Sequence, residues 1–289
     1  GEHAIIWRKL VADTETPVGA ALKLIEPGRG DFLLESVEGG EVRGRYSLLG
    51  IDPDLMFRAT GATCEVNRNW QHDQTDFAPL AGNSLEELRA LAEACRIDMP
   101  KGLPPALACL VGYFGYETIG LVEKLPRAPQ SDLALPDMLF ARPTLVLVFD
   151  NLTDSLFCIA PLWADGPKSA ANPDHAIERA SERIDNVLRK LGNAVPAQPR
   201  ASDLPEMDLN AVMDPADYAA MVLKAKDYIT AGDIFQVVLA QRFTCPFTLP
   251  PFALYRALRR VNPSPFLYFL DLPGFAVVGS SPEILVRVR

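Results

Sequence analysis

Three segments combine side chains that could bind or transform a small polar molecule. Leu33-Leu34-Glu35-Ser36 places a carboxylate beside a hydroxyl, residues 232–243 (GDIFQVVLAQRF) carry the amide of Gln236, and residues 262–269 (NPSPFLYF) join prolines to aromatic rings ahead of GSSPE at 279–283. An amide donates and accepts hydrogen bonds but cannot deprotonate water, which a lysine of lowered pKa can do. On spacing alone, Gln236 is equally well a strand residue with backbone partners, and a turn between helix and strand explains the prolines better than a ligand site does.

Several common catalytic motifs are missing from the sequence. It contains no P-loop, no GxGxxG after a predicted strand, no HExxH, no GxSxG and no CxxC, and each absence removes an enzyme class. His3, His72 and His175 adjoin neither a nucleophile nor a carboxylate cluster. We therefore expect these histidines to be exposed rather than catalytic.

Taken in order, the three segments resemble the large, synthase subunit family of anthranilate synthase, among the chorismate-utilising enzymes. Arg45-Tyr46-Ser47 and Gly112-Tyr113-Phe114-Gly115-Tyr116 extend the match over most of the chain. Any one motif could arise by chance, but the ordered set is specific. The resemblance implies an α+β fold in which large, mainly antiparallel β-sheets pack as a sandwich with helices outside. It also implies that the chain is the N-terminal portion of such a subunit, truncated at its C-terminus.

The resemblance implies a lyase reaction, in which chorismate receives ammonia at C2 and loses pyruvate to give anthranilate for tryptophan biosynthesis. Relatives that add water have a lysine where this sequence has Gln236. Because ammonia is already a nucleophile, Gln236, near chorismate C2, favours an aminating member. Mg²⁺ is implied as the cofactor, and a glutamine amidotransferase subunit or domain as the ammonia-supplying partner, so we expect a hetero-oligomer. The family's remaining catalytic residues and Mg²⁺ ligands lie beyond Arg289, so this chain alone is expected to be inactive and to hold no metal.

The resemblance also implies allosteric feedback inhibition by tryptophan, bound between the segments 33–36 and 262–269. Ser36 is expected to bind the inhibitor's polar main-chain groups, and Glu35 is available to its ammonium group. Pro265, Phe266 and Leu267 are expected to line the rest of the pocket. A carboxylate, a hydroxyl and a wall of proline and aromatic groups suit an amino-acid zwitterion with an indole ring.

Composition and charge narrow the classes of partner and the cellular location to be expected. The 28 Lys plus Arg against 37 Asp plus Glu give a formal charge of −9, and no basic run is present, which argues against nucleic-acid and anionic-membrane partners. No apolar stretch is long enough to span a bilayer and the start does not resemble a signal peptide, so a cytoplasmic location is expected. Five widely spaced cysteines are expected to be reduced and mostly buried.

Capping signals and hydrophobic periodicity predict the elements that position these segments. Helices are predicted from Thr16-Pro17 to Leu24, after a capping box of Ser84 with Glu87, over 173–191, from Asp214-Pro215 to Gly232, and over 252–261. Strands are predicted over 32–37, 46–51, 55–60 with 63–68, 107–116, 144–149 with 155–160, 234–243, 266–270 with 275–279, and from 284 to the last residue. Within 107–116, Gly112 and Gly115 indicate a bulge or a close approach of backbones.

The predicted organisation is a regulatory domain over residues 1–192, a proline-interrupted linker over 193–210, and the start of a chorismate-binding catalytic domain over 211–289. Two alternatives to an anthranilate synthase subunit remain. One is aminodeoxychorismate synthase, a sister enzyme that aminates C4, and the other is a tryptophan-binding module without catalytic activity.

Overall fold

The computed structural model describes residues 4–36, 44–104, 110–125, 132–163, 173–198 and 207–287. The chain divides into two compact units, the first formed by residues 1–196 with 251–289 and the second by residues 197–250. Segment 251–289 therefore packs with the N-terminal segment, although the predicted boundaries place it in a separate domain. Those boundaries stay a prediction.

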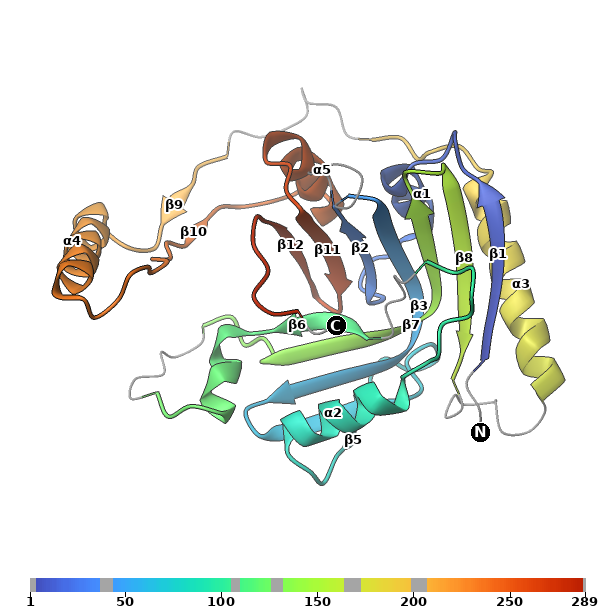
Figure 1. Ribbon diagram of the computed structural model, residues 1–289, viewed down its shortest axis with the longest axis horizontal. Helices are drawn as coiled ribbons and strands as arrows, with labels where there is room; N and C mark the ends of the chain where they lie inside the picture. The colour runs from blue at the N-terminus through green and yellow to red at the C-terminus, as the bar shows by residue number, and fades with distance from the viewer. Residues whose placement is uncertain are drawn as a thin grey trace. The chain divides into compact units, whose positions relative to one another are not determined.

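The first unit is built on one ten-stranded sheet in which all paired strands are antiparallel. Its main path runs β1-β8-β7-β3-β2-β11-β12, with β4 beside β3, β5 beside β4 and β6 beside β7 (Figure 1). Together with the helices described next, this sheet confirms the expected class of antiparallel sheet with helices outside. The strands are β1 (Ala4–Val11), β2 (Asp31–Glu35), β3 (Tyr46–Thr60), β4 (Thr63–Asn67), β5 (Ala78–Pro79), β6 (Val111–Phe114), β7 (Met138–Asp150), β8 (Ser155–Leu162), β11 (Phe266–Leu272) and β12 (Phe275–Ser281).

The two longest strands, β3 and β7, form the centre of the sheet. Their pairing runs from Tyr46 opposite Asp150 to Ala59 opposite Met138, with a register shift between Pro53 and Leu55. The two segments predicted separately at 46–51 and 55–60 are therefore one strand. Next to the shift, Asp52 takes a positive φ of 54°, which a non-glycine residue adopts rarely. Asp52 also lines a pocket of the first unit.

Three helices contribute to one hydrophobic core on one side of the sheet. Leu24 of α1 (Pro17–Leu24), Ile184 of α3 (Pro173–Leu191) and Tyr255 of α5 (Pro251–Val261) are all buried in this core, together with inward residues of the strands. A second core forms where α2 (Ser84–Ala94) packs on β3 and β4. A short 3₁₀ helix, η1 (Tyr116–Leu121), follows β6. No helix within the described ranges has the length and apolar character needed to span a membrane.

The helix starts follow the predicted capping chemistry with one correction. Thr16 caps α1, since its hydroxyl accepts a hydrogen bond from the Gly19 N–H at 3.0 Å. The predicted capping box of Ser84 with Glu87 is wrong, because the N-cap of α2 is Asn83, whose side-chain oxygen accepts from the Glu86 N–H. Ser84 is the first helical residue, and its hydroxyl instead donates to the Gly61 carbonyl at 2.7 Å.

The second unit holds one helix, α4 (Pro215–Ala231), and the short pair β9 (Asn210–Ala211) and β10 (Phe243–Thr244) among its described residues. Asp214 caps α4 and Gly232 ends it with a left-handed φ of 82°, as predicted. The strand predicted over 234–243 is wrong except at its last residue, and residues 284–287 also lie in no strand. In both places the apolar pattern lacks a neighbouring strand, and without one the backbone groups of an extended segment have no partner.

Candidate functional site

The sheet brings together two of the predicted segments that lie more than two hundred residues apart in sequence. Strand β2 pairs with β11 so that Glu35 is opposite Leu267 and Leu34 is opposite Tyr268. The predicted tryptophan-binding residues therefore come from adjacent strands. Leu267 is buried, whereas Ser36, Pro265 and Phe266 are half-buried at the end of this strand pair.

Strand alternation divides these residues between two faces. Successive side chains of a strand point to opposite faces of the sheet. Leu267 belongs to the core beneath α5, and Glu35, its partner, is bonded to that helix. Leu34 and Tyr268 line a hollow on the other face, and Phe266 shares that face because it lies two residues before Tyr268. Glu35 and Leu267 thus point to the face of the sheet that α5 covers. A ligand in the hollow would contact Leu34, Phe266 and Tyr268 on the other face instead.

The Glu35 carboxylate is already bound by two residues of α5. The Tyr255 hydroxyl donates to Oε2 at 2.5 Å, while Arg259 donates from Nε to Oε2 at 2.8 Å and from Nη2 to Oε1 at 3.2 Å. The Glu35 side chain is only 3% exposed, against 34% for Arg259. Burial, followed by the adjacent carboxylate, raises the pKa of Tyr255, so its hydroxyl stays protonated and remains a donor. The sequence predicts that Glu35 is available to a ligand's ammonium group. In this structure its carboxylate is instead bound by Tyr255 and Arg259.

The sequence interpretation missed both donors. Arg259 lies near the end of α5, where a positive charge complements the helix dipole, and it also pairs with Glu35. A signal was available, because a glutamate inside an apolar strand is almost never buried without a partner. What the sequence does not say is which arginine supplies that partner.

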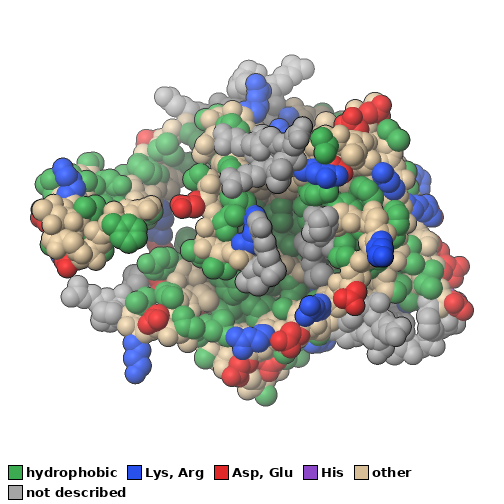
Figure 2. All heavy atoms as spheres, in the orientation of Figure 1, with side chains coloured by type: hydrophobic (Ala, Val, Ile, Leu, Met, Phe, Trp, Pro, Cys, Tyr) green, Lys and Arg blue, Asp and Glu red, His purple; other side chains and the backbone are tan. Residues whose placement is uncertain are grey.

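The hollow beside Leu34 and Tyr268 is a largely apolar cavity of about 640 Å³. Figure 2 shows hydrophobic side chains gathered in the hollowed centre of this face. Tyr113 from β6 packs edge-on against Phe275 from β12, with ring centroids 6.0 Å apart, and its hydroxyl donates to the Pro136 carbonyl at 2.6 Å. Burial, with a smaller contribution from the charge of Asp137, raises the pKa of Tyr113 to about 12. A cavity of this size and character suits a ligand with an aromatic ring.

Close backbone packing forms one wall of this hollow. A Cβ on Gly112 in β6 would lie 1.9 Å from the Leu139 carbonyl oxygen of β7, so only glycine fits there. This confirms the close approach of backbones predicted for Gly112. Residues 107–109, the start of the predicted strand 107–116, lie outside the described residues.

The turn before β11 is fixed by hydrogen bonds of the Ser264 hydroxyl. The Ser264 hydroxyl donates to the Ser281 carbonyl at 2.8 Å and accepts from the Phe266 N–H at 3.2 Å. Pro265 thus lies in a turn fixed to the end of β12, in line with the structural interpretation of these prolines. The same turn presents Phe266 at the sheet edge.

Gln236 belongs to the second unit, where it is exposed and lies in no helix or strand between α4 and β10. Among the described residues, no group of three or more His, Cys, Asp or Glu side chains could hold a metal ion. The described residues therefore do not fit a Mg²⁺ site. Cys64, Cys95 and Cys158 are buried and Cys245 is half-buried, and these four form no disulfide, so the expected burial is confirmed for the first three.

The model of the chorismate binding enzyme family matches residues 31–289. This chain belongs to that family. The match covers most of the chain and includes β2, β11 and the segment around Gln236. The fold and the strand pairing described above are therefore those of a chorismate binding enzyme chain.

Several relatives of this chorismate binding enzyme chain share the name anthranilate synthase component 1. The chain is similar to anthranilate synthase component 1 of Cereibacter sphaeroides, with 47% identity over 100% of the chain and 57% of the relative. It is also similar to the protein of that name from Thermus thermophilus, with 38% identity over 97% of the chain and 56% of the relative. A crystal structure of anthranilate synthase component I from Streptococcus pneumoniae matches with a TM-score of 0.65 and 25% identity, over 97% of this chain and 58% of that one.

These findings confirm the resemblance to anthranilate synthase component I. They also show that the chain spans a little over half the length of the relatives it matches. The part of each relative that has no counterpart here is more than two fifths of its length. What such a whole protein does is accordingly a proposal for this chain.

Proposed function

We propose that this chain is part of an anthranilate synthase large subunit, a lyase that converts chorismate and ammonia into anthranilate and pyruvate for tryptophan biosynthesis. The observation that carries the proposal is the match to proteins named anthranilate synthase component 1 along 97% to 100% of the chain. Ammonia would come from glutamine through an amidotransferase partner, which makes the working protein a hetero-oligomer.

In this proposal Gln236 lies near C2 of chorismate and positions the incoming ammonia through hydrogen bonds. Its amide cannot take a proton from water, which favours amination over hydration. The residues that bind the chorismate carboxylates, and the Mg²⁺ that would neutralise charge on the substrate, belong to the part of the protein beyond Arg289. The chain described here is therefore proposed to supply one side of the catalytic site and to be inactive alone.

We further propose that tryptophan inhibits the complete enzyme by binding at the ends of β2 and β11. Ser36 would contact the inhibitor's polar main-chain groups, and Pro265 and Phe266 would flank the indole. The contacts of Glu35 with α5 support a changed role, in which its carboxylate holds β2 against that helix. Leu267 would support the pocket from the core side of the sheet.

Two measurements test the proposal. Anthranilate formation from chorismate and ammonia is expected from the longer protein but not from residues 1–289 alone, and product analysis separates it from amination at C4.

Calorimetry with tryptophan tests the regulatory role, where Ser36→Phe should abolish binding and relieve inhibition. Thr63→Phe, which alters an exposed hydroxyl residue at the β3–β4 turn, is the matched control. Inhibition that is equal in Ser36→Phe and wild type would remove the regulatory role, whereas a product aminated at C4 would remove the synthase role.

A further inference from the structure

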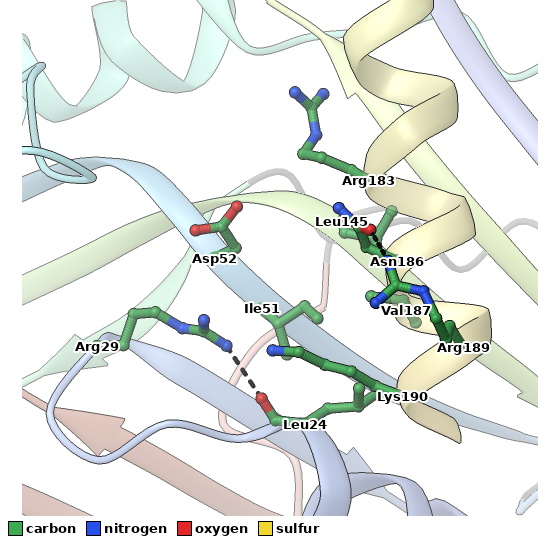
Figure 3. A pocket seen from close by; sticks show the side chains of 10 residues that line it. All are labelled: Leu24, Arg29, Ile51, Asp52, Leu145, Arg183, Asn186, Val187, Arg189 and Lys190. Carbon is green, nitrogen blue, oxygen red and sulfur yellow. Dashed lines mark hydrogen bonds between the residues drawn. The ribbon is translucent and has the colours of Figure 1, made fainter. Parts of the chain in front are cut away.

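A second pocket of about 400 Å³ opens in the first unit between α3, β3 and the turn that leads into β2. Its polar lining comes from Arg183, Asn186 and Lys190 on one face of α3, Asp52 on β3, and Arg29 in the turn (Figure 3). Residues three, four and seven positions apart share a helix face, which is how α3 supplies three of them. The pocket is at the opposite end of β2 from Glu35.

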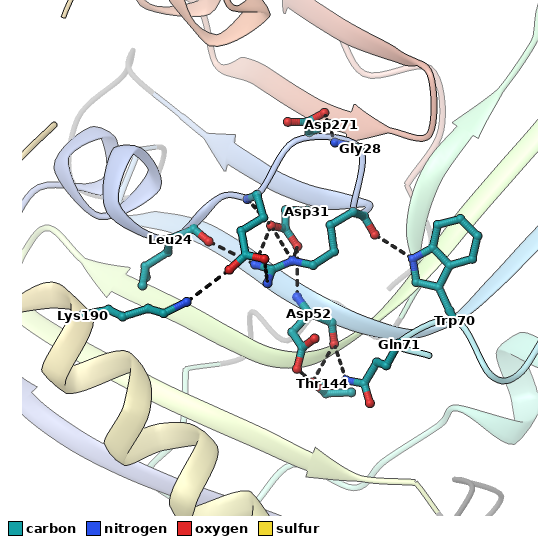
Figure 4. A network of polar contacts seen from close by, with 11 residues as sticks. Leu24, Gly28, Asp31, Asp52, Trp70, Gln71, Thr144, Lys190 and Asp271 are labelled. Carbon is teal, nitrogen blue, oxygen red and sulfur yellow. Dashed lines mark hydrogen bonds and ion pairs between the residues drawn. The ribbon is translucent and has the colours of Figure 1, made fainter. Parts of the chain in front are cut away.

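The floor of this pocket is held by a network that leaves Arg29 fully engaged. Its guanidinium donates to the buried Asp31 carboxylate at 2.7 to 3.0 Å and to the Leu24 carbonyl at 3.0 Å, and its carbonyl accepts from the Trp70 indole at 2.7 Å. The Asp52 N–H also donates to Asp31, at 2.9 Å (Figure 4). Asp31 therefore neutralises Arg29 and fixes the backbone of Asp52.

Arg183 is the cation that the described residues do not satisfy. Its Nε is shielded from solvent and has no hydrogen-bond partner among them. Desolvation lowers the pKa of Arg183, and the carboxylates of Asp52 and Asp54 oppose this shift. A buried N–H of a charged group without an acceptor is destabilising, and an acceptor placed in the pocket would remove that penalty.

The remaining lining adds positive charge and donors. Arg189 donates to the Asn186 side-chain oxygen, which leaves the Asn186 amide N–H groups as donors. Lys190 is half-exposed and gives one hydrogen bond, at 3.1 Å, to Glu26, so two of its three N–H donors remain for a ligand. Arg183, Arg189 and Lys190 thus face a single acidic side chain of the lining, Asp52.

We propose that this pocket binds a small oxyanion, the carboxylate or phosphate group of a metabolite, with Arg183 donating to its oxygen atoms. Guanidinium groups match the geometry of both anions, and the volume lies in the range of small-molecule sites. Lys190 and Arg189 supply charge at the rim. The carboxylate of Asp52 offers an acceptor for a hydroxyl on the same ligand.

Thermal unfolding of the chain at constant ionic strength tests this site, with inorganic phosphate and malonate as probes against chloride. A ligand that binds only the folded chain raises the melting temperature in a saturable way. Arg183→Gln should weaken the apparent affinity about tenfold to hundredfold, as expected for the loss of a hydrogen bond from a charged donor. Arg89→Gln changes the net charge equally at an exposed position on α2 and should leave the affinity unchanged.

The outcomes separate a binding role from a purely structural one. If Arg183 binds the anion, Arg183→Gln without anion is at least as stable as wild type, because a buried N–H without an acceptor is removed. A larger response to phosphate than to malonate assigns a phosphate ligand, and the reverse assigns a carboxylate. The proposal is overturned if neither anion gives a saturable response, or if Arg183→Gln and Arg89→Gln respond equally to both.

Discussion

Replacing Glu35 by glutamine should destabilise the first unit by about 3 kcal/mol. The Glu35 carboxylate is 3% exposed and accepts three hydrogen bonds from Tyr255 and Arg259. Breaking a buried ion pair costs about 3–5 kcal/mol because the remaining charge keeps its desolvation penalty. Arg259 is 34% exposed and can regain water, so the lower end of that range applies.

Thermal unfolding followed by tryptophan fluorescence measures this cost. All three tryptophans, Trp7, Trp70 and Trp163, lie in the first unit, so the signal reports that unit. For a unit of this size, about 3 kcal/mol corresponds to a fall of roughly 6–12 °C in melting temperature. Urea unfolding at fixed temperature gives the free energy directly.

A matched control and a double-mutant cycle test whether the buried ion pair and hydrogen bonds of Glu35 cause this loss of stability. Glu65→Gln breaks a pair with Arg58 that is shorter, at 2.6 Å, but both side chains are more than a third exposed, so it should cost less than about 1 kcal/mol. Combining Glu35→Gln with Tyr255→Phe should show coupling of about 0.5–3 kcal/mol. If Glu35→Gln costs no more than Glu65→Gln, or the cycle shows no coupling, the buried network does not hold β2 against α5.

Three further results are expected. Gly112→Ala should cost about 1–3 kcal/mol by forcing β6 away from β7, measured by urea unfolding, whereas Gly120→Ala, with open space around the new methyl group, should be tolerated; equal costs would contradict the close approach. The hydrogen bond from Arg45 lowers the pKa of Asp150 from 3.8, so this carboxylate stabilises the fold above pH 3.8 and loses that effect as the pH falls through its lowered pKa. The stability advantage of wild type over Asp150→Asn should therefore shrink in acid, and a constant difference from pH 7 to pH 3 would refute the assignment. Burial raises the pKa of Cys158 to about 12, so iodoacetamide at pH 8 should label it only after unfolding, and peptide mass spectrometry that finds rapid native labelling would contradict its burial.

Helix ends and hairpins could be predicted from the sequence, because each depends on one short segment. Thr16 before Pro17 predicts the start of α1, and Gly232 predicts the end of α4, because capping depends on a few consecutive residues. The hairpin of β7 with β8 and that of β11 with β12 follow from alternation on both sides of a short turn. The first strand, β1, was not predicted, since its place in the sheet depends on a distant partner, β8.

Prediction failed where an extended pattern needs a neighbour that sequence does not reveal. Residues 234–242 have the apolar character of a strand, yet they lie in no strand, and Phe235 is 94% exposed. Strand propensity depends on packing and pairing more than on the segment itself. The motifs of this segment nevertheless carried the family resemblance, since residue identity and order do not depend on whether a strand forms.

The sequence by itself determined the family and the antiparallel class, since these follow from residue types in a fixed order, and it predicted the residues of the candidate tryptophan site. Only the tertiary structure decided which of those residues point to each face of the sheet. Pairing of β2 with β11 puts Glu35 opposite Leu267, and the two faces of a strand then direct Glu35 to Tyr255 and Arg259. The pocket around Arg183 likewise exists only because α3 packs against β8 and β1, which brings charges of α3 into one pocket with Asp52 and Arg29 from distant segments. Burial and long-range pairing set which charges meet, and a linear sequence records neither.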